Sequence, residues 1–132
     1  MGERSIKEIT ELSKRINAEA VILFGSRARD DSLKESDYDL LIIDKKFEDM
    51  SVFDRITYVN DILGWYRIEP IAFTPEEFER KFSSYSPLAL DPIYEGKAIV
   101  NESFLEKYKK KLTKLIKSGR LKRYRGTWKI IS

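Results

Sequence analysis

The sequence predicts an α/β or α+β domain built around a small β-sheet flanked by helices. Its 132 residues suit one compact domain. Two short apolar runs, at residues 20–24 and 38–43, are typical of buried strands, and segments with helical periodicity precede and follow them. We find no internal repeat, low-complexity tract or interdomain linker. Residues 1–132 are therefore expected to form a single domain.

The first elements in the chain are a helix and two strands. The helix is indicated by apolar residues at helical spacing that stop near Asn17, namely Ile6, Ile9, Leu12 and Ile16. The strands are the apolar runs at residues 20–24 and 38–43, which end at Gly25 and Asp44. The polar stretch between the strands predicts a loop with at most one helical turn.

The middle of the chain predicts a second helix, a third strand and a short third helix. Ser51 can cap a helix that ends at Gly64. Its apolar stripe comprises Val52, Phe53, Ile56, Val59, Ile62 and Leu63. Residues 66–73 predict a strand, and Pro70 favours an edge position or a local irregularity because proline cannot donate to a ladder. The Thr-Pro-Glu-Glu segment that starts at Thr74 then begins a short helix.

The last third of the chain predicts two more helices with a short strand between them. A Ser-Pro pair at residues 86–87 begins the first helix, which ends at Gly96, and residues 98–100 form the strand. A capping box that starts at Ser103 begins the second helix. This helix is rich in lysine, and its apolar stripe comprises Phe104, Leu105, Tyr108, Leu112, Leu115 and Ile116.

The net charge of +3 hides an asymmetry between the body and the C-terminal segment. Residues 104–132 contain eleven Lys or Arg and one acid, Glu106, whereas residues 1–103 contain fourteen bases and twenty-one acids. An acidic body joined to a basic segment indicates a polyanionic partner, such as nucleic acid, or an acidic protein partner. The same pattern is equally typical of a solvated amphipathic helix with a frayed end.

The basic segment allows several structural interpretations. We expect its helix to dock through the apolar stripe, and residues 120–132 to form a mobile part that faces an acceptor. A last strand in residues 120–132 is an alternative. Tyr124 and Trp128, which lie among Lys and Arg, either form a stacking surface for nucleic acid or pack the segment onto the body.

The composition excludes several classes of function. The chain contains no Cys and no His, which excludes disulfides, thiolate or imidazole zinc sites and every Ser-His or Cys-His mechanism. No apolar run approaches the roughly 18 residues of a membrane span, and the start lacks the apolar segment of a signal peptide. We expect a soluble, cytoplasmic protein without membrane contact. The absence of Gln and the abundance of Lys, Arg and Glu resemble the bias of thermophile proteins.

Two acids and a Gly-Ser pair form the most informative motif. Asp37 and Asp39 are separated by one residue at the start of a predicted strand, so both carboxylates point the same way. Oxygen ligands of this kind favour Mg²⁺ or Mn²⁺, which completes its coordination with substrate phosphates and water. Taken singly, a Gly-Ser after a strand is usually a turn, and an Asp-x-Asp is usually a solvated loop edge.

The Gly-Ser pair lies where the first strand ends. Gly25 allows a tight turn and close approach to a ligand, and the Ser26 hydroxyl with free backbone N–H groups can hold a phosphate. Arg27 and Arg29 can add charge-assisted contacts. The P-loop pattern is absent from the sequence. In combination with the two acids, this segment predicts a phosphate cradle beside a metal site.

With these residues the sequence resembles the minimal nucleotidyltransferases of the DNA polymerase beta superfamily. Their signature is Gly-Ser, about ten residues, Asp-x-Asp in a strand and a third acid on a later strand, which here is Glu69. The Thr-Pro-Glu-Glu-Phe at residues 74–78 is also frequent in that family. The resemblance covers about residues 20–100. This chain departs from it with Asp30 where many relatives have glycine, and with glutamate rather than aspartate as the third acid.

The resemblance implies a mixed sheet of the polymerase beta palm type and an in-line attack on the α-phosphorus of a nucleoside triphosphate. Asp37 and Asp39 would bind the Mg²⁺ or Mn²⁺ that accompanies the triphosphate, and Asp39 would bridge to a second ion. Glu69 would help to hold that ion and accept the proton of an acceptor hydroxyl. Gly25 and Ser26, with Arg27 and Arg29, would hold the phosphates, and the transferred group would be AMP.

The resemblance also suggests partners. Family members often occur as the antitoxin of a toxin–antitoxin pair with a helical HEPN protein, to which they transfer AMP, so a HEPN-type protein is one expected partner. Two alternatives remain. The chain is a non-catalytic binding partner on the same fold, or a nucleic-acid-binding module that uses its basic C-terminus.

Overall fold

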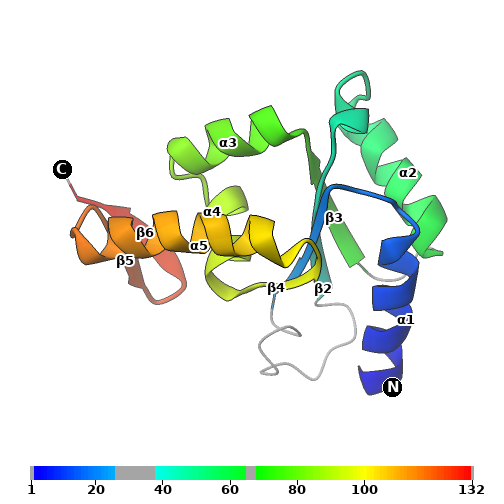
Figure 1. Cartoon of the computed structure of the whole chain (residues 1–132), viewed down its shortest axis with the longest axis horizontal. Coiled ribbons are helices and arrows are strands. Elements are labelled where there is room, and N and C mark those ends of the chain that lie inside the picture. Colours follow the sequence, from blue (N-terminus) through cyan, green and yellow to red (C-terminus); the bar gives the residue numbers. More distant parts are fainter. Residues whose placement is uncertain (1, 26–37, 65–67, 132) are drawn as a thin grey trace.

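The computed structural model describes residues 2–25, 38–64 and 68–131, and in these residues it shows a four-stranded sheet with helices on both faces (Figure 1). The strands are β1 (Ala20–Phe24), β2 (Tyr38–Ile43), β3 (Ile68–Phe73) and β4 (Lys97–Val100), in the order β3-β2-β1-β4. β1 is antiparallel to β2 and β4, whereas β2 and β3 are parallel. The predicted fold class, a mixed sheet flanked by helices, is confirmed.

The helices form two layers around the sheet (Figure 1). One layer contains α1 (Gly2–Lys14), α2 (Val52–Leu63) and the short 3₁₀ helix η1 (Lys45–Phe47), and the other contains α3 (Pro75–Ser83), α4 (Pro87–Glu95) and α5 (Glu102–Lys117). Within the described part of the chain, no helix combines the length and the apolar character that crossing a membrane requires.

The central strands are apolar on both faces because helices cover both. Ile22 and Phe24 of β1 pack in the core on the side of α3, α4 and α5. Val21 and Leu23, which alternate with them, pack in the core on the side of α1 and α2. A continuous apolar run is the pattern expected for a strand buried on both faces. β3 is an edge strand of the sheet, as Pro70 predicts.

The helix ends largely follow the predicted caps. Ser51 caps α2, which ends at Gly64, and Thr74 forms a capping box with Glu77 at the start of α3. The prediction for α5 is wrong: its cap is Asn101, whose side chain accepts a hydrogen bond from the Phe104 N–H, so the helix begins before Ser103. The stripe of α2 also needs correction, because Val52 and Phe53 in its first turn are 71% and 76% exposed, and its buried residues are Arg55, Val59, Asn60 and Leu63.

Residues after α5 form a β-hairpin that packs on the body, and the expectation of a mobile segment at residues 120–132 is wrong for the part that the structure describes. The hairpin consists of β5 (Leu121–Tyr124) and β6 (Thr127–Ile130). Leu121 is 1% exposed and joins the core of α3, α4 and α5. Asp91 of α4 accepts hydrogen bonds from Arg123 Nη1 (2.6 Å) and Trp128 Nε1 (2.7 Å). An ion pair and an aromatic side chain therefore dock the basic hairpin.

Candidate active site

Three strand ends meet at one end of the sheet and bring together residues that are distant in the sequence. Because β1 and β2 are antiparallel, β1 ends where β2 begins, and Phe24 lies opposite Asp39. β3 runs parallel to β2 and places Glu69 opposite the same residue, Asp39. Gly25 directly follows Phe24. The end of β1 and the starts of β2 and β3 therefore form one candidate site.

Asp39 and Glu69 lie on the face of the sheet that α3, α4 and α5 cover. Side chains alternate between the two faces along a strand. Leu41 and Ile71, two residues further along β2 and β3, belong to or pack against the core on that face. Neighbouring strands are about 4.8 Å apart. The two carboxylates therefore extend from adjacent backbone positions on one face.

The environment of these two acids suits a divalent cation. Asp39 is half-buried and Glu69 is exposed. The two residues lie at paired positions of adjacent strands, so their carboxylate oxygens are available from one face of the sheet. Oxygen ligands suit Mg²⁺ and Mn²⁺, which are commonly held by one or two carboxylates together with substrate phosphates. The residues present therefore fit the ion that the family resemblance implies.

Gly25 gives the end of β1 its sharp change of direction. Its φ angle is 96°, a left-handed conformation that side-chain-bearing residues rarely adopt, and the residue is buried. A residue with a β-carbon would be strained at this position. β1 ends at Phe24, which lies opposite Asp39, and Gly25 follows it directly; the expected phosphate cradle of Gly25 and Ser26 stays a prediction.

The remaining predicted site residues lie outside the described residues. These are Ser26, Arg27, Arg29 and Asp37. Of the three predicted acids, the structure brings together two, Asp39 and Glu69. Across residues 2–25, 38–64 and 68–131 there is no cluster of three or more Asp, Glu, His or Cys that could hold a metal ion. The full set of three acids and the phosphate cradle thus stay predictions.

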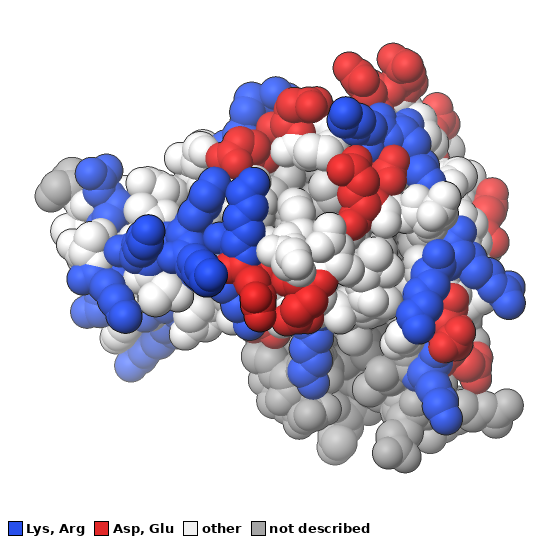
Figure 2. Space-filling view, viewed as in Figure 1, with Lys and Arg blue, Asp and Glu red and all other residues white. Residues whose placement is uncertain are grey.

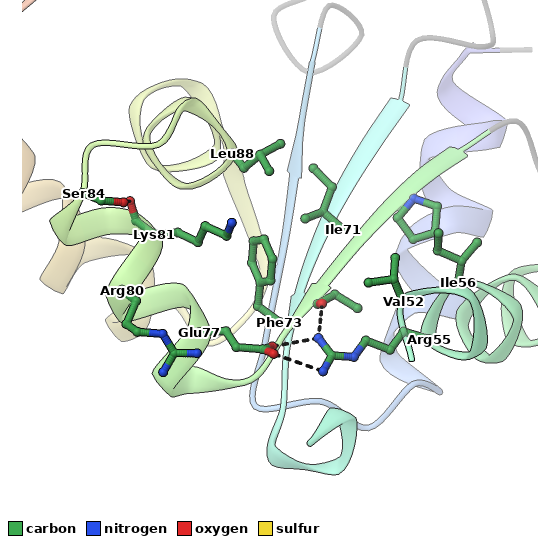
Figure 3. A pocket seen from close by; sticks show the side chains of 12 residues that line it. Val52, Arg55, Ile56, Ile71, Phe73, Glu77, Arg80, Lys81, Ser84 and Leu88 are labelled. Carbon is green, nitrogen blue, oxygen red and sulfur yellow. Dashed lines mark hydrogen bonds and ion pairs between the residues drawn. The ribbon is translucent and has the colours of Figure 1, made fainter. Parts of the chain in front are cut away.

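A cleft of about 650 Å³ lies along the outer edge of β3 (Figure 3). Its β3 side consists of residues 70–73, which directly follow Glu69. α2 forms one wall, and α3 with the start of α4 forms the other (Figure 3). Ile71 and Phe73 make its floor apolar, whereas Arg80 and Lys81 of α3 add positive charge. The cleft can accept a group that has both negative charge and an apolar surface.

Arg55 ties together three elements beside this cleft. The residue is 7% exposed, and its Nη1 donates to Glu77 Oε1 at 2.7 Å and to the Ala72 carbonyl at 3.0 Å (Figure 3). Nη2 donates to Glu77 Oε2 at 3.2 Å, and Nε donates to the Met50 carbonyl at 3.0 Å. The hydrogen bonds from Arg55, assisted by those from Thr74, lower the pKa of Glu77 despite partial burial. Arg55 therefore holds α2, the end of β3 and α3 in a fixed arrangement.

Sequence reasoning missed the role of Arg55. It used the Thr-Pro-Glu-Glu segment, which contains Glu77, only as the start of a helix, and it predicted the buried stripe of α2 from apolar residues alone. The available signal was spacing, because Arg55 precedes Val59 and Leu63 by four and eight residues and so shares their buried side. A cation on the buried side of a helix requires a partner, which the sequence alone does not identify.

Comparison with known proteins places this site in a family. The sequence model described as "Polymerase beta, Nucleotidyltransferase" matches residues 5–74, which is more than half of the chain. The chain therefore belongs to the polymerase beta nucleotidyltransferase family, and the resemblance stated above is confirmed. The match includes Gly25, Asp39 and Glu69 and ends before α3.

One solved structure is also similar. It is the crystal structure of a protein from Sulfolobus solfataricus that is provisionally assigned as a nucleotidyltransferase. The two chains are 32% identical, the similarity covers 60% of this chain and 75% of that one, and the TM-score is 0.49. No curated protein matches this chain. Family membership indicates nucleotidyl transfer as the class of activity.

Proposed function

We propose that the protein is a metal-dependent nucleotidyltransferase that moves a nucleoside monophosphate from a nucleoside triphosphate to an acceptor hydroxyl. The observation that carries the proposal is the register of β2 and β3, which places Glu69 opposite Asp39 beside the turn at Gly25. Two adjacent carboxylates next to a tight turn are suited to a triphosphate with its divalent ion. The assignment of AMP as the transferred group rests on the resemblance to the family.

Each described residue has a definite task in this reaction. Asp39 would hold Mg²⁺ or Mn²⁺, and Glu69 would share that task on the acceptor side. The bound ion would supply Lewis-acid stabilisation of the charge that develops on the phosphate oxygens. Gly25 would let the backbone turn closely around the triphosphate.

The transfer step forms one bond and breaks another. The acceptor oxygen forms a bond to the α-phosphorus, and the bond from that phosphorus to the bridging oxygen of pyrophosphate breaks. The proton of the acceptor hydroxyl passes to the carboxylate of Glu69, which lies at the start of an edge strand and is exposed. The cleft along residues 70–73 offers the acceptor a path to this carboxylate.

The proposed function has two versions, which differ in the molecule that carries the acceptor hydroxyl. Hydroxyl groups of proteins and of nucleic acids are both chemically suitable. A HEPN-type helical protein, in an antitoxin role, stays a prediction from the resemblance. The experiment below identifies the acceptor without assuming either class.

The test is a transfer assay with each α-labelled nucleoside triphosphate, Mg²⁺ and a cell lysate as the acceptor source. We expect label from ATP to appear on one macromolecule. Asp39→Asn should reduce the rate more than about a hundredfold, since metal stabilisation supplies several kcal/mol and 1.4 kcal/mol is about tenfold. Glu69→Gln should retain triphosphate binding but lose about a hundredfold in transfer.

A matched control uses an acid at the opposite end of β2. Asp49 is exposed and follows η1, whereas Asp39 lies at the start of β2. Asp49→Asn should therefore transfer at the wild-type rate. Wild-type transfer by Asp39→Asn, or no transfer of any of the four nucleotides by the wild type with purified total RNA and lysate protein, would contradict the proposed function.

A further inference from the structure

The β5–β6 hairpin has one face that packs on the body and one that does not. Its register places Lys122 opposite Lys129 and Tyr124 opposite Thr127. Because side chains alternate along each strand, these four residues share one face, and all four are exposed. The alternate residues Leu121, Arg123 and Trp128 face the body. We call the face of Lys122, Tyr124, Thr127 and Lys129 the outer face of the hairpin.

The charges of the outer face are not explained by the stability of the hairpin. Like charges directly opposite each other on neighbouring strands are destabilising, and Lys122 lies opposite Lys129. On the packed face, Arg123 pairs with Asp91 at 2.6 Å and with Glu95 at 3.7 Å. Within the described part of the chain, neither Lys122 nor Lys129 has an acidic partner.

The turn of the hairpin adds a third cation in an unfavourable conformation. Arg125 and Gly126 are the two turn residues, with φ angles of 49° and 75°. Two-residue turns with positive φ at both positions favour Asn-Gly, because residues with long side chains are strained there. An arginine at this position keeps positive charge at the tip of the hairpin where asparagine would fit better.

The outer face also presents an aromatic ring between cations. Tyr124 is 44% exposed. Lys129 Nζ lies 4.7 Å and Arg125 Cζ 5.3 Å from the centroid of its ring. An exposed ring that is contacted by two cations can stack on an unpaired base, while the cations reach the phosphates on either side.

α5 extends the positive surface beyond the hairpin. Its exposed cations include Lys109, Lys110, Lys114 and Lys117. Figure 2 shows Lys and Arg gathered over the end of the molecule that α5 and the hairpin form. A polyanion that lies across this end can therefore contact both elements.

We propose that the outer face of the hairpin, together with the exposed lysines of α5, binds single-stranded RNA. The cations match the phosphates of a nucleic acid backbone, and the exposed ring of Tyr124 can stack on an unpaired base. RNA routinely presents such bases in loops and at ends. An acidic protein would match the charge but would make no use of the ring. The inference goes beyond nucleotidyl transfer, because this binding needs neither a triphosphate nor a metal ion.

The first test measures the affinity for a labelled single-stranded RNA of about 20 nucleotides by fluorescence anisotropy in EDTA, as a function of salt. We expect log K to fall linearly with log salt concentration. The triple variant Lys122→Gln, Arg125→Gln, Lys129→Gln should reduce the slope by about 2, since each phosphate contact on a single strand contributes about 0.7. The control triple variant, which changes net charge equally at the exposed Lys7, Arg15 and Lys45, should keep the wild-type slope.

The second test separates stacking from charge. Tyr124→Ala should weaken RNA binding about fivefold or more, whereas Tyr124→Phe keeps the ring and should bind like the wild type. Arg125→Asn should raise the melting temperature, because asparagine suits the turn, and yet weaken RNA binding. If Arg125 stabilised the turn instead, Arg125→Asn would lower the melting temperature.

Three results would overturn the inference. In the first, the wild type does not bind the RNA at about 50 mM salt. In the second, the control triple variant weakens binding as much as the hairpin variant. In the third, poly-glutamate competes as well as RNA and Tyr124→Ala has no effect, which would indicate an acidic protein partner.

None of these measurements involves nucleotidyl transfer. An RNA complex without transfer activity would contradict the proposed function alone, and transfer without RNA binding would contradict this inference alone.

Discussion

Tyr108 of α5 donates a hydrogen bond of 2.7 Å to Glu79 Oε1, and so joins α5 to α3 across 29 positions of sequence. The ring of Tyr108 also contacts the rings of Phe78 and Phe82, with both centroid distances at 4.8 Å. The ring of Tyr108 therefore packs against other aromatic rings, while its hydroxyl donates to a carboxylate. The contact fixes the basic helix α5 in the layer of α3 and α4, on the face of the sheet that carries Asp39.

Tyr108→Phe should reduce the free energy of unfolding by about 1 kcal/mol, because it removes one hydrogen bond to a partly exposed carboxylate. Burial, then the hydrogen bond and charge of Glu79, raise the pKa of Tyr108 above its ordinary value of 10.0. A raised pKa in the folded state means that this stability is present below pH 10 and is lost as pH rises further. Urea unfolding of the wild type and Tyr108→Phe around and above that pH measures both effects, and parallel curves would contradict the assignment.

Arg55 and Glu77 should show strong coupling in a double-mutant cycle of Arg55→Met and Glu77→Gln. Arg55 is 8% and Glu77 29% exposed in their side chains, so each single change leaves a poorly solvated partner. We expect about 2–3 kcal/mol for Arg55→Met and a coupling energy above about 1 kcal/mol. The pair of Lys111 and Glu79, with both side chains 46% exposed, provides a control with coupling below about 1 kcal/mol.

The same ion pair predicts a loss of stability in acid. Hydrogen bonds from Arg55 lower the pKa of Glu77 below its ordinary value of 4.5, so its contribution is present above pH 4.5 and is lost as pH falls through the folded-state pKa. Comparing the pH dependence of unfolding in the wild type and Glu77→Gln isolates this part. The variant should be less stable near neutral pH and should lose less stability on acidification. Asp49→Asn, at an exposed acid, should follow the wild-type curve.

Ligand binding should stabilise the protein through the candidate site. Mg²⁺ with a nucleoside triphosphate should raise the melting temperature, and a ligand at a hundred times its Kd adds about 2.7 kcal/mol. Asp39→Asn should abolish this shift, whereas Asp49→Asn should preserve it. Differential scanning fluorimetry with and without each ligand makes the measurement. Equal shifts in the wild type and Asp39→Asn would exclude Asp39 from the binding site.

Leu121 should contribute much more to the stability of the protein than Ile130, the residue that faces it across the hairpin. Leu121 is 1% exposed and lies opposite Ile130, which is 59% exposed. Leu121→Ala should cost about 2–3 kcal/mol of unfolding free energy. Ile130→Ala should cost less than about 0.5 kcal/mol, because its side chain is largely in water already. Similar losses for both variants in chemical denaturation would show that the hairpin is not docked through Leu121.

Local sequence signals predicted the elements whose structure depends on neighbouring residues. Ser51 and Thr74 begin helices because their side chains accept hydrogen bonds from backbone groups three residues later. Pro70 indicated an edge strand because its backbone cannot donate. The alignment of Asp39 with Glu69 followed only from the family resemblance, since the register of two strands depends on pairing between distant residues.

The elements that sequence reasoning missed depend on distant partners. The sequence alone predicts a basic, mobile segment where the structure has the hairpin. The acid that pairs with Arg123 is Asp91, which lies 32 positions earlier in the chain and is not indicated by any local pattern. Arg55 similarly finds Glu77 at a distance of 22 positions. Phe53 is apolar but exposed, because the buried side of α2 is centred on Val59 and Leu63, and the apolar residues alone did not identify that centre.

The backbone of β3 offers little to a neighbouring chain. Pro70 has no N–H group, and the Ala72 carbonyl is occupied by Arg55. An incoming strand would find neither partner at these positions, although β3 lies at the edge of the sheet. Pairing of two molecules edge to edge through β3 would therefore have to compete with the hydrogen bond from Arg55 to the Ala72 carbonyl. Together with the missing N–H of Pro70, this disfavours β3 as a template for a strand of another chain.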